Sequence, residues 1–96
     1  MEKKFKLFSG TNSKYLANKV VNDNFIISKS RLDKFEDGEF CPVLEESVGD
    51  YNVFIIQSLF MPCSNLMELM LMCDACKRAS AKNIIAIIPY MGWAFL

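Results

Sequence analysis

Residues Asn52 to Tyr90 read NVFIIQSLFMPCSNLMELMLMCDACKRASAKNIIAIIPY, and this stretch decides the fold. Its first apolar run, Val53–Ile56, is typical of a strand that is buried on both faces. From Asn65 to Ala79 the chain is rich in Leu, Met and Ala and has no Pro or Gly, which predicts a helix of about four turns. A second apolar run, Ile84–Ile88, ends at Pro89 and predicts another buried strand. Two such strands joined by a helix predict a right-handed βαβ unit with parallel strands, and therefore an α/β protein.

The predicted helix combines a capping signal with apolar residues on nearly all of its sides. We expect Asn65 to cap its N-terminus, and Glu68 three positions later completes a capping box. One apolar side of the helix is expected to cover the sheet. Because no other helix of the chain is free to cover the opposite side, we expect that side to contact another subunit or a further domain.

Shorter segments predict the remaining elements. Phe5–Phe8 predicts a strand, Ser13–Asn22 a helix, Phe25–Ile27 a third apolar strand and Val43–Leu44 a short strand. Together with the βαβ unit, these segments predict a mostly parallel sheet with flanking helices. Residues 1–96 are therefore expected to form one domain, slightly smaller than the commonest domain size of about 100–150 residues.

The ligands of a parallel α/β sheet collect at the carboxyl ends of its strands. The segments that follow Phe8, Ile56 and Ile88 therefore form the candidate face. The first of these segments, Ser9–Ser13, precedes a predicted helix, and backbone N–H groups at such a position can hold an anion. The same residue types also make an ordinary turn and helix cap, and we favour this second interpretation.

Composition and charge exclude several classes of partner. The chain has 11 basic and 11 acidic residues, so its formal net charge of zero gives no reason to expect nucleic acid or an anionic membrane as a partner. The uncharged run at residues 83–96 is too short to span a bilayer. The first residues contain no apolar region typical of a signal peptide, so we expect a cytoplasmic protein.

Four cysteines raise the question of a metal site. Cys73 and Cys76 are three positions apart on one apolar stripe of the predicted helix, where Cys behaves as a small hydrophobic residue. Cys41 and Cys63 are 22 positions apart and the chain has no His, a pattern that does not match the ligand spacing of a zinc site. We therefore expect structural cysteines and no metal-binding residues. The other members of the apolar stripe are Leu66, Leu69 and Met70.

The segment from Arg31 to Phe40 allows two interpretations. Asp37-Gly38 is a turn signal between aromatic residues, which predicts a hairpin. Phe35, Asp37 and Glu39 also alternate, and a strand would point their side chains the same way. An aromatic side chain beside two carboxylates suits a purine, because the ring stacks on Phe and the exocyclic amine donates to the carboxylates. A purine site is therefore the alternative to a plain hairpin.

Seven motifs in a regular order resemble one known family, ribose-phosphate pyrophosphokinase (PRPP synthetase), over its N-terminal third. The resemblance extends from about Lys6 to Ala94. It implies a phosphoribosyltransferase-like (Rossmann-like) α/β fold that is incomplete in this chain, and a homo-oligomer of dimers stacked into hexamers. The motifs are Leu7–Asn12, Phe35-x-Asp37-Gly38-Glu39, Glu46–Val48, Val53–Ser58, Asn65–Leu69, Asp74–Ala81 and Ile88–Ala94.

The family makes 5-phosphoribosyl 1-diphosphate for nucleotide biosynthesis by transferring the diphosphoryl group of ATP to ribose 5-phosphate, with Mg²⁺. The resemblance implies that Phe35, Asp37, Gly38 and Glu39 help to hold the adenine of ATP in the active site of a neighbouring subunit. In that role Phe35 stacks on the purine, and the two carboxylates accept hydrogen bonds from its exocyclic amine. None of these residues acts as an acid or a base.

The departures from the family concern the catalytic parts. After Gly-Trp-Ala the family continues with Arg-Gln-Asp, whereas this chain has Phe95-Leu96. Diphosphoryl transfer depends on cationic groups and Mg²⁺, and the metal-binding His and Asp, the basic flexible loop and the ribose-phosphate loop have no counterpart here. We therefore expect no catalytic residue in this chain and no activity from it alone. The alternative is a non-catalytic regulatory subunit of such an oligomer, and a generic flavodoxin-like nucleotide binder would leave the ordered motifs unexplained.

Overall fold

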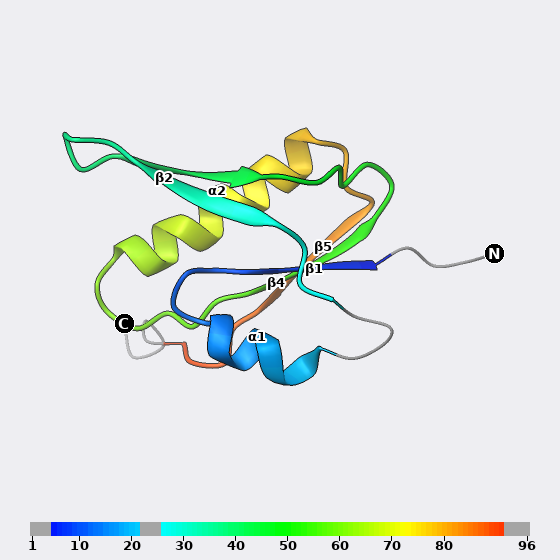
Figure 1. Ribbon diagram of the computed structural model, residues 1–96, viewed down its shortest axis with the longest axis horizontal. Helices are drawn as coiled ribbons and strands as arrows, with labels where there is room; N and C mark the ends of the chain where they lie inside the picture. Colours follow the sequence, from blue (N-terminus) through cyan, green and yellow to red (C-terminus); the bar gives the residue numbers. More distant parts are fainter. Residues whose placement is uncertain (1–4, 22–25, 92–96) are drawn as a thin grey trace.

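The computed structural model describes residues 5–21 and 26–91 (Figure 1). Three parallel strands form a sheet in the order β1-β4-β5, and β2 and β3 form a separate antiparallel hairpin. The helix α2 covers one face of the sheet, and the shorter helix α1 lies against the other. In chain order the elements are β1 (Phe5–Ser9), α1 (Lys14–Val20), β2 (Ser30–Lys34), β3 (Phe40–Leu44), β4 (Asn52–Ile56), α2 (Ser64–Arg78) and β5 (Asn83–Ile87).

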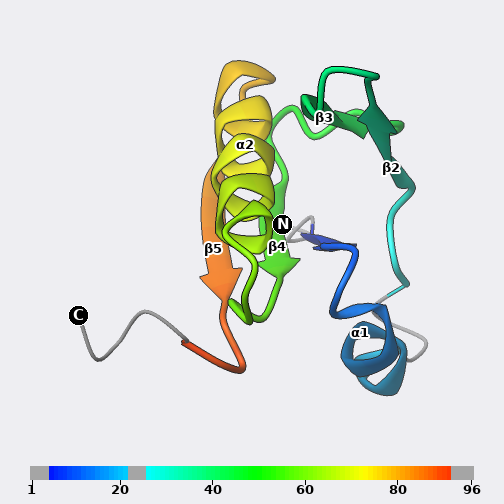
Figure 2. The same ribbon diagram turned by 90° about the vertical axis from the view of Figure 1, so that its left-hand side faces the viewer.

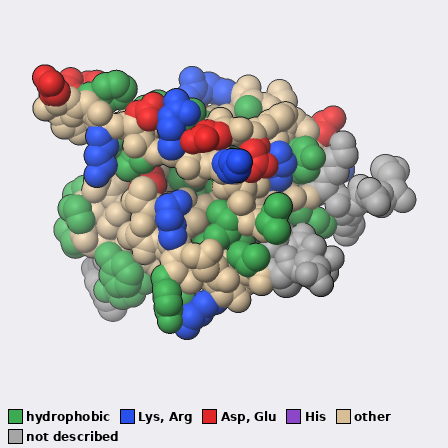
Figure 3. Space-filling model, viewed as in Figure 1, with side chains coloured by type: hydrophobic (Ala, Val, Ile, Leu, Met, Phe, Trp, Pro, Cys, Tyr) green, Lys and Arg blue, Asp and Glu red, His purple; other side chains and the backbone are tan. Residues whose placement is uncertain are grey.

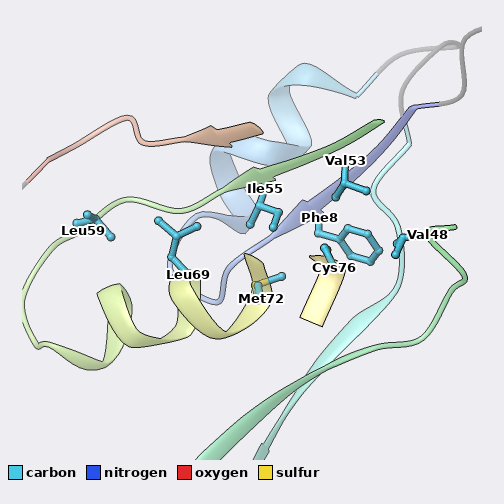
Figure 4. Close-up of a cluster of buried hydrophobic side chains, with 8 residues drawn as sticks. All are labelled: Phe8, Val48, Val53, Ile55, Leu59, Leu69, Met72 and Cys76. Atoms are coloured by element: carbon cyan, nitrogen blue, oxygen red, sulfur yellow. The ribbon is translucent and has the colours of Figure 1, made fainter. Parts of the chain in front are cut away.

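The βαβ unit is confirmed. β4 and β5 pair in parallel, with Val53 opposite Ile84, and α2 connects them. Alternate side chains of β4 point to opposite faces of the sheet, so Val53 and Ile55 face α2 and pack with Leu69 and Met72 in the main core (Figure 4). The predicted α/β class is therefore correct, and its physical origin is the burial of apolar strands beneath an apolar helix.

The hairpin covers the side of α2 for which the sequence suggested no partner within the chain. β3 lies along α2, and its Leu44 packs against the core that contains Met72. Pro42 of β3 also lines a small hollow together with Met72. The premise that no element of the chain packs on this side is therefore wrong, because an antiparallel hairpin lies there, and the expected contact with another subunit or domain stays a prediction. Met67 and Met70 of α2 remain exposed.

β5 is less buried than its apolar sequence predicts. It is an edge strand, since β4 pairs with it on one side only within the described sheet. Ile84 packs against the core beneath α2, whereas Ile85 and Ile87 are 39% and 40% exposed. Burial on both faces is therefore wrong for this strand. The reason is visible in Figure 2, where α1 lies on the β1 side of the sheet, well away from β5.

The predicted strand Phe25–Ile27 is replaced by a single contact. Phe25 lies outside the described residues, and Ile27 makes one isolated parallel bridge to Leu7 of β1. The Ser28 N–H then donates to the Leu7 carbonyl at 2.7 Å, and the chain leaves the sheet to begin β2 at Ser30. Neither helix in the described part of the chain is long and apolar enough to cross a membrane.

Candidate functional site

The residues between β2 and β3 form a tight turn. The Phe35 N–H donates to the Glu39 carbonyl at 2.8 Å, and the Gly38 N–H donates to the Phe35 carbonyl at 3.1 Å. The Asp37 carboxylate accepts the Glu39 N–H at 3.0 Å, and Gly38 has a φ of 91°, which favours glycine. The predicted hairpin is confirmed. The predicted alternation of Phe35, Asp37 and Glu39 along a strand is wrong, because the turn contains all three.

The turn projects from the body of the molecule and carries acidic side chains at its tip (Figure 3). A hollow of about 290 Å³ separates the turn from the first residues of α2. Phe35, Gly38 and Glu39 line the hollow on the hairpin side, and Glu68 lines it from α2. Asp37 does not line it. The structure therefore brings three of the four candidate residues to one hollow, with the Phe35 side chain 56% exposed.

The hollow contains charges of both signs. Lys34 and Glu39 line it from the hairpin, and the carboxylate of Glu68 lines it from the helix. An exposed aromatic ring and hydrogen-bond acceptors can bind the face and the amine edge of a planar base. No group of three His, Cys, Asp or Glu side chains among residues 5–21 and 26–91 is placed to hold a metal ion.

The loops at the carboxyl ends of the three parallel strands meet, as predicted for the candidate face. The Gly10 N–H donates to the Ile56 carbonyl at 2.9 Å, and the Leu59 N–H donates to the Tyr90 carbonyl at 2.7 Å. The Ser13 hydroxyl accepts the Ser58 N–H at 2.8 Å. These contacts hold Ser9–Ser13 against the end of β4, as expected of an ordinary turn. The cap that we expected with this turn is absent, because Ser13 occupies the N-cap position of α1 without a side-chain cap hydrogen bond.

Glu68 holds this loop and does not cap its own helix. Its side chain is only 4% exposed, and its two oxygens accept the Thr11 N–H at 2.9 Å and the Thr11 hydroxyl at 2.8 Å. Cys63 occupies the N-cap position of α2 without a side-chain cap, and the Asn65 amide donates to the Phe60 carbonyl. The predicted capping box is therefore wrong, because a loop distant in sequence supplies better donors to the buried carboxylate.

Gln57 is a residue that sequence reasoning missed. It is fully buried, and its Nε2 donates to Glu68 Oε1 at 3.0 Å. Its Oε1 has no hydrogen-bond partner among the described residues. The available signal was a polar side chain directly after a buried apolar run, where a partner is required. Gln57, Glu68 and Thr11 therefore form one hydrogen-bonded cluster.

The cysteines divide into two classes. Cys76 is fully buried in the main core, so its predicted structural role is confirmed. Burial, with a smaller effect of the neighbouring Cys73, raises the pKa of the Cys76 thiol to about 11. Burial also raises the pKa of Cys73. Cys41 and Cys63 are exposed free thiols, and Met70 of the predicted apolar stripe is exposed as well.

Comparisons with known proteins agree on one family. Residues 5–95 match the family model described as the N-terminal domain of ribose phosphate pyrophosphokinase. A ribose-phosphate pyrophosphokinase of Porphyromonas gingivalis is 51% identical over 94 residues, which cover 97% of this chain and 30% of the relative. Ribose-phosphate pyrophosphokinase 2, chloroplastic, of Spinacia oleracea is 50% identical over 93 residues, or 95% of this chain and 24% of the relative.

The fold gives the same result. The crystal structure of phosphoribosylpyrophosphate synthetase from Mycobacterium smegmatis matches with a TM-score of 0.75 and 30% sequence identity, over 97% of this chain and 32% of that one. The chain thus spans less than a third of the length of these relatives. Because the family model matches nearly all of its residues, the chain belongs to the ribose-phosphate pyrophosphokinase family and corresponds to the N-terminal domain of that family.

Proposed function

We propose that residues 1–96 supply part of the N-terminal domain of a cytoplasmic ribose-phosphate diphosphokinase. The observation that carries this proposal is the family match over residues 5–95, together with 51% identity to a ribose-phosphate pyrophosphokinase. The reaction proposed for the longer polypeptide transfers the diphosphoryl group of ATP to ribose 5-phosphate, which yields 5-phosphoribosyl 1-diphosphate for nucleotide biosynthesis. The 96 residues alone are inactive in this proposal, because the metal-binding His and the basic flexible loop of the family have no counterpart in their sequence.

The contribution of this chain is to hold the adenine of ATP. Phe35 stacks on the purine, and its exposure at the tip of the hairpin supports this role. Glu39 and Asp37 accept hydrogen bonds from the exocyclic amine, and Gly38 permits the turn that places them. One Asp37 oxygen already accepts the Glu39 N–H, which leaves acceptor capacity on the carboxylate for a ligand.

In this proposal Mg²⁺ is held by other parts of the longer enzyme, and the described residues contain no group of three His, Cys, Asp or Glu side chains placed to hold a metal ion. The dispersed carboxylates of the hairpin are exposed, and the buried carboxylate of Glu68 is occupied by donors from Thr11 and Gln57. In the longer enzyme Mg²⁺ neutralises charge on the phosphates of ATP. The residues of this chain therefore orient the base and leave the phosphates to other parts of the protein.

We also propose that the hairpin serves a neighbouring copy in a homo-oligomer. The turn projects away from the sheet (Figure 1). Residues 35–39, which form it, are all exposed in the single chain. In this proposal the neighbouring subunit encloses the part of a bound adenine that the exposed turn leaves open to solvent. The zero net charge of the chain supports small-molecule substrates over nucleic acid.

A chimera tests this proposal. Residues 1–96 replace the matched segment of the Porphyromonas gingivalis enzyme, and formation of 5-phosphoribosyl 1-diphosphate is measured at varied ATP concentration. We expect activity in the chimera and none from the 96 residues alone. Phe35→Ala should raise KM for ATP by roughly 5- to 150-fold, because removal of a stacking ring costs about 1–3 kcal/mol.

The matched control is Tyr15→Ala, which removes an aromatic ring that is 71% exposed on α1, away from the hairpin. Its kinetic constants should equal those of the unmodified chimera. An unchanged KM in Phe35→Ala removes Phe35 from the ATP site. An inactive chimera that still assembles with the intact enzyme and alters its rate favours the regulatory-subunit alternative.

A further inference from the structure

The hairpin of β2 and β3 is a sheet of its own, and its base lies next to the main sheet. Before β2, the Ser28 N–H donates to the Leu7 carbonyl of β1 at 2.7 Å, and after β3 the Glu45 N–H donates to the Lys29 carbonyl at 2.9 Å. β3 packs on α2, whereas β2 has its main contact with β3. The turn lies at the opposite end of the hairpin (Figure 1). We call residues 28–29 and 45–46 the hairpin base.

One carboxylate connects the hairpin base to β1. Oε2 of Glu46 accepts the Lys29 N–H, where the chain enters the hairpin. Oε1 of Glu46 lies 3.2 Å from Nζ of Lys6, a residue of β1. The Lys6 ammonium also donates to the Ser47 carbonyl at 2.6 Å and lies 4.5 Å from the centre of the Tyr51 ring. Glu46 therefore joins the chain that enters the hairpin, the chain that leaves it and the main sheet.

The surroundings of this carboxylate make its contacts stronger than those of a surface ion pair. The Lys6 and Glu46 side chains are 16% and 31% exposed, compared with 55% and 40% for Arg31 and Asp33, which form an ion pair on the hairpin. Partial shielding from water strengthens the attraction between opposite charges. The Lys29 N–H and, to a smaller extent, Lys6 lower the pKa of Glu46, so the carboxylate is charged at neutral pH.

The length of β2 makes the position of the turn sensitive to the hairpin base. β2 has five residues, Ser30–Lys34, and spans about 17 Å at about 3.3 Å per residue. A tilt of about 5° at the base would displace the turn by about 1.5 Å over this length, and misplacement of a binding group by about 1 Å is costly. We infer that Glu46 is a positioning residue, which fixes the hairpin base on β1 and thereby sets where Phe35 meets the adenine of ATP. This inference rests on the proposed function.

The first test measures the kinetic constants of the chimera with ATP and ribose 5-phosphate varied in turn. Glu46→Ala removes both acceptors and should raise KM for ATP at least about threefold, with KM for ribose 5-phosphate unchanged. Glu46→Gln should raise KM for ATP less, because its amide oxygen still accepts the Lys29 N–H. The matched control, Asp74→Ala, breaks the exposed 2.9 Å ion pair of Asp74 with Arg78 on α2 and should change neither constant.

A second background shows whether Glu46 acts through the aromatic ring. In a chimera that already contains Phe35→Ala, Glu46→Ala should raise KM for ATP no further, because no ring is left to be placed. Hydrogen exchange measured by mass spectrometry without nucleotide reports on the hairpin independently of ATP. Glu46→Ala should speed exchange in residues 28–45 at least about tenfold, and Asp74→Ala should leave it unchanged.

Four results would overturn the inference. The first is a raised KM for ATP in Phe35→Ala and an unchanged one in Glu46→Ala, which leaves the proposed ATP site intact. The second is an equal effect of Glu46→Ala with and without the Phe35 ring, and the third is an equal rise in KM for both substrates. The fourth is unchanged hydrogen exchange in Glu46→Ala, whatever the result for ATP. An unchanged KM in Phe35→Ala instead refutes the proposed role of Phe35, and hydrogen exchange then decides whether Glu46 fixes the turn.

Discussion

Replacing Gly10 by Ala places a methyl group inside the Gln57 amide. A Cβ atom at position 10 would lie 2.0 Å from Gln57 Oε1, 2.2 Å from Cδ and 2.7 Å from Nε2. All three distances are far below van der Waals contact. Gln57 is fully buried, so its amide has no solvent to move into. Moving the amide to relieve the overlap therefore disturbs the hydrogen bond from Nε2 to Glu68.

The cost follows from these two effects. Inserting a methyl group into a packed interior destabilises a protein by about 1–3 kcal/mol. Losing a hydrogen bond to a charged group costs about 1.5–3 kcal/mol. Because one displacement causes both, the two costs are not fully additive, and we expect Gly10→Ala to lower the free energy of unfolding by about 2–4 kcal/mol.

Urea unfolding followed by far-UV circular dichroism measures this difference. The control is Gly49→Ala, where the nearest atoms lie 3.9 Å from the added Cβ, so the free energy of unfolding should change by less than about 0.5 kcal/mol. In the double variant Gly10→Ala with Gln57→Ala, the methyl group occupies the space of the missing amide. The double variant should therefore lose less stability than the sum of the single variants, by about 0.5–3 kcal/mol. The reasoning is refuted if the Gly10→Ala chain is as stable as the unmodified one. It is also refuted if the losses of stability in the two single variants sum to the loss in the double variant.

Two further predictions concern titratable groups. The pKa of Glu46 is lowered, chiefly by the hydrogen bond from the Lys29 N–H, so its contribution to stability is present above pH of about 4.5 and is lost as the pH falls. Glu46→Gln should therefore lower the urea midpoint at pH 7, and this loss should shrink as the pH falls to 3; an equal loss at both values would contradict the assigned charge effect. Iodoacetamide at pH 8 should modify the exposed Cys41 and Cys63 rapidly and Cys76, with its pKa of about 11, only as fast as the chain unfolds. Rapid modification of Cys76, read by mass spectrometry, would show that the main core opens.

The βαβ unit could be predicted because its signals are local. Val53–Ile56 is a continuous apolar run, and an apolar segment without Pro or Gly follows it, so each element type can be recognised from a few neighbouring residues. The turn at Asp37-Gly38 is local in the same sense, since its hydrogen bonds join Phe35 to Gly38 and Glu39. The structure confirms both.

The role of Glu68 could not be predicted from neighbouring residues. Its position after Asn65 satisfies the pattern of a capping box. In the structure its carboxylate accepts two hydrogen bonds from Thr11, a residue 57 positions away along the chain. A buried carboxylate binds the donors that packing brings to it, and the sequence pattern does not contain that information.

The sequence by itself determined the βαβ unit, the turn of the hairpin, the α/β class and the family, because apolar periodicity and turn residues act over short stretches of chain. Only the tertiary structure decided which faces those elements bury. The hairpin covers α2, while Ile87 lies at an edge with one face open. The physical reason is that burial depends on neighbours distant in sequence. An apolar run shows that a strand requires burial, and the packing of the whole chain determines which neighbouring elements bury it.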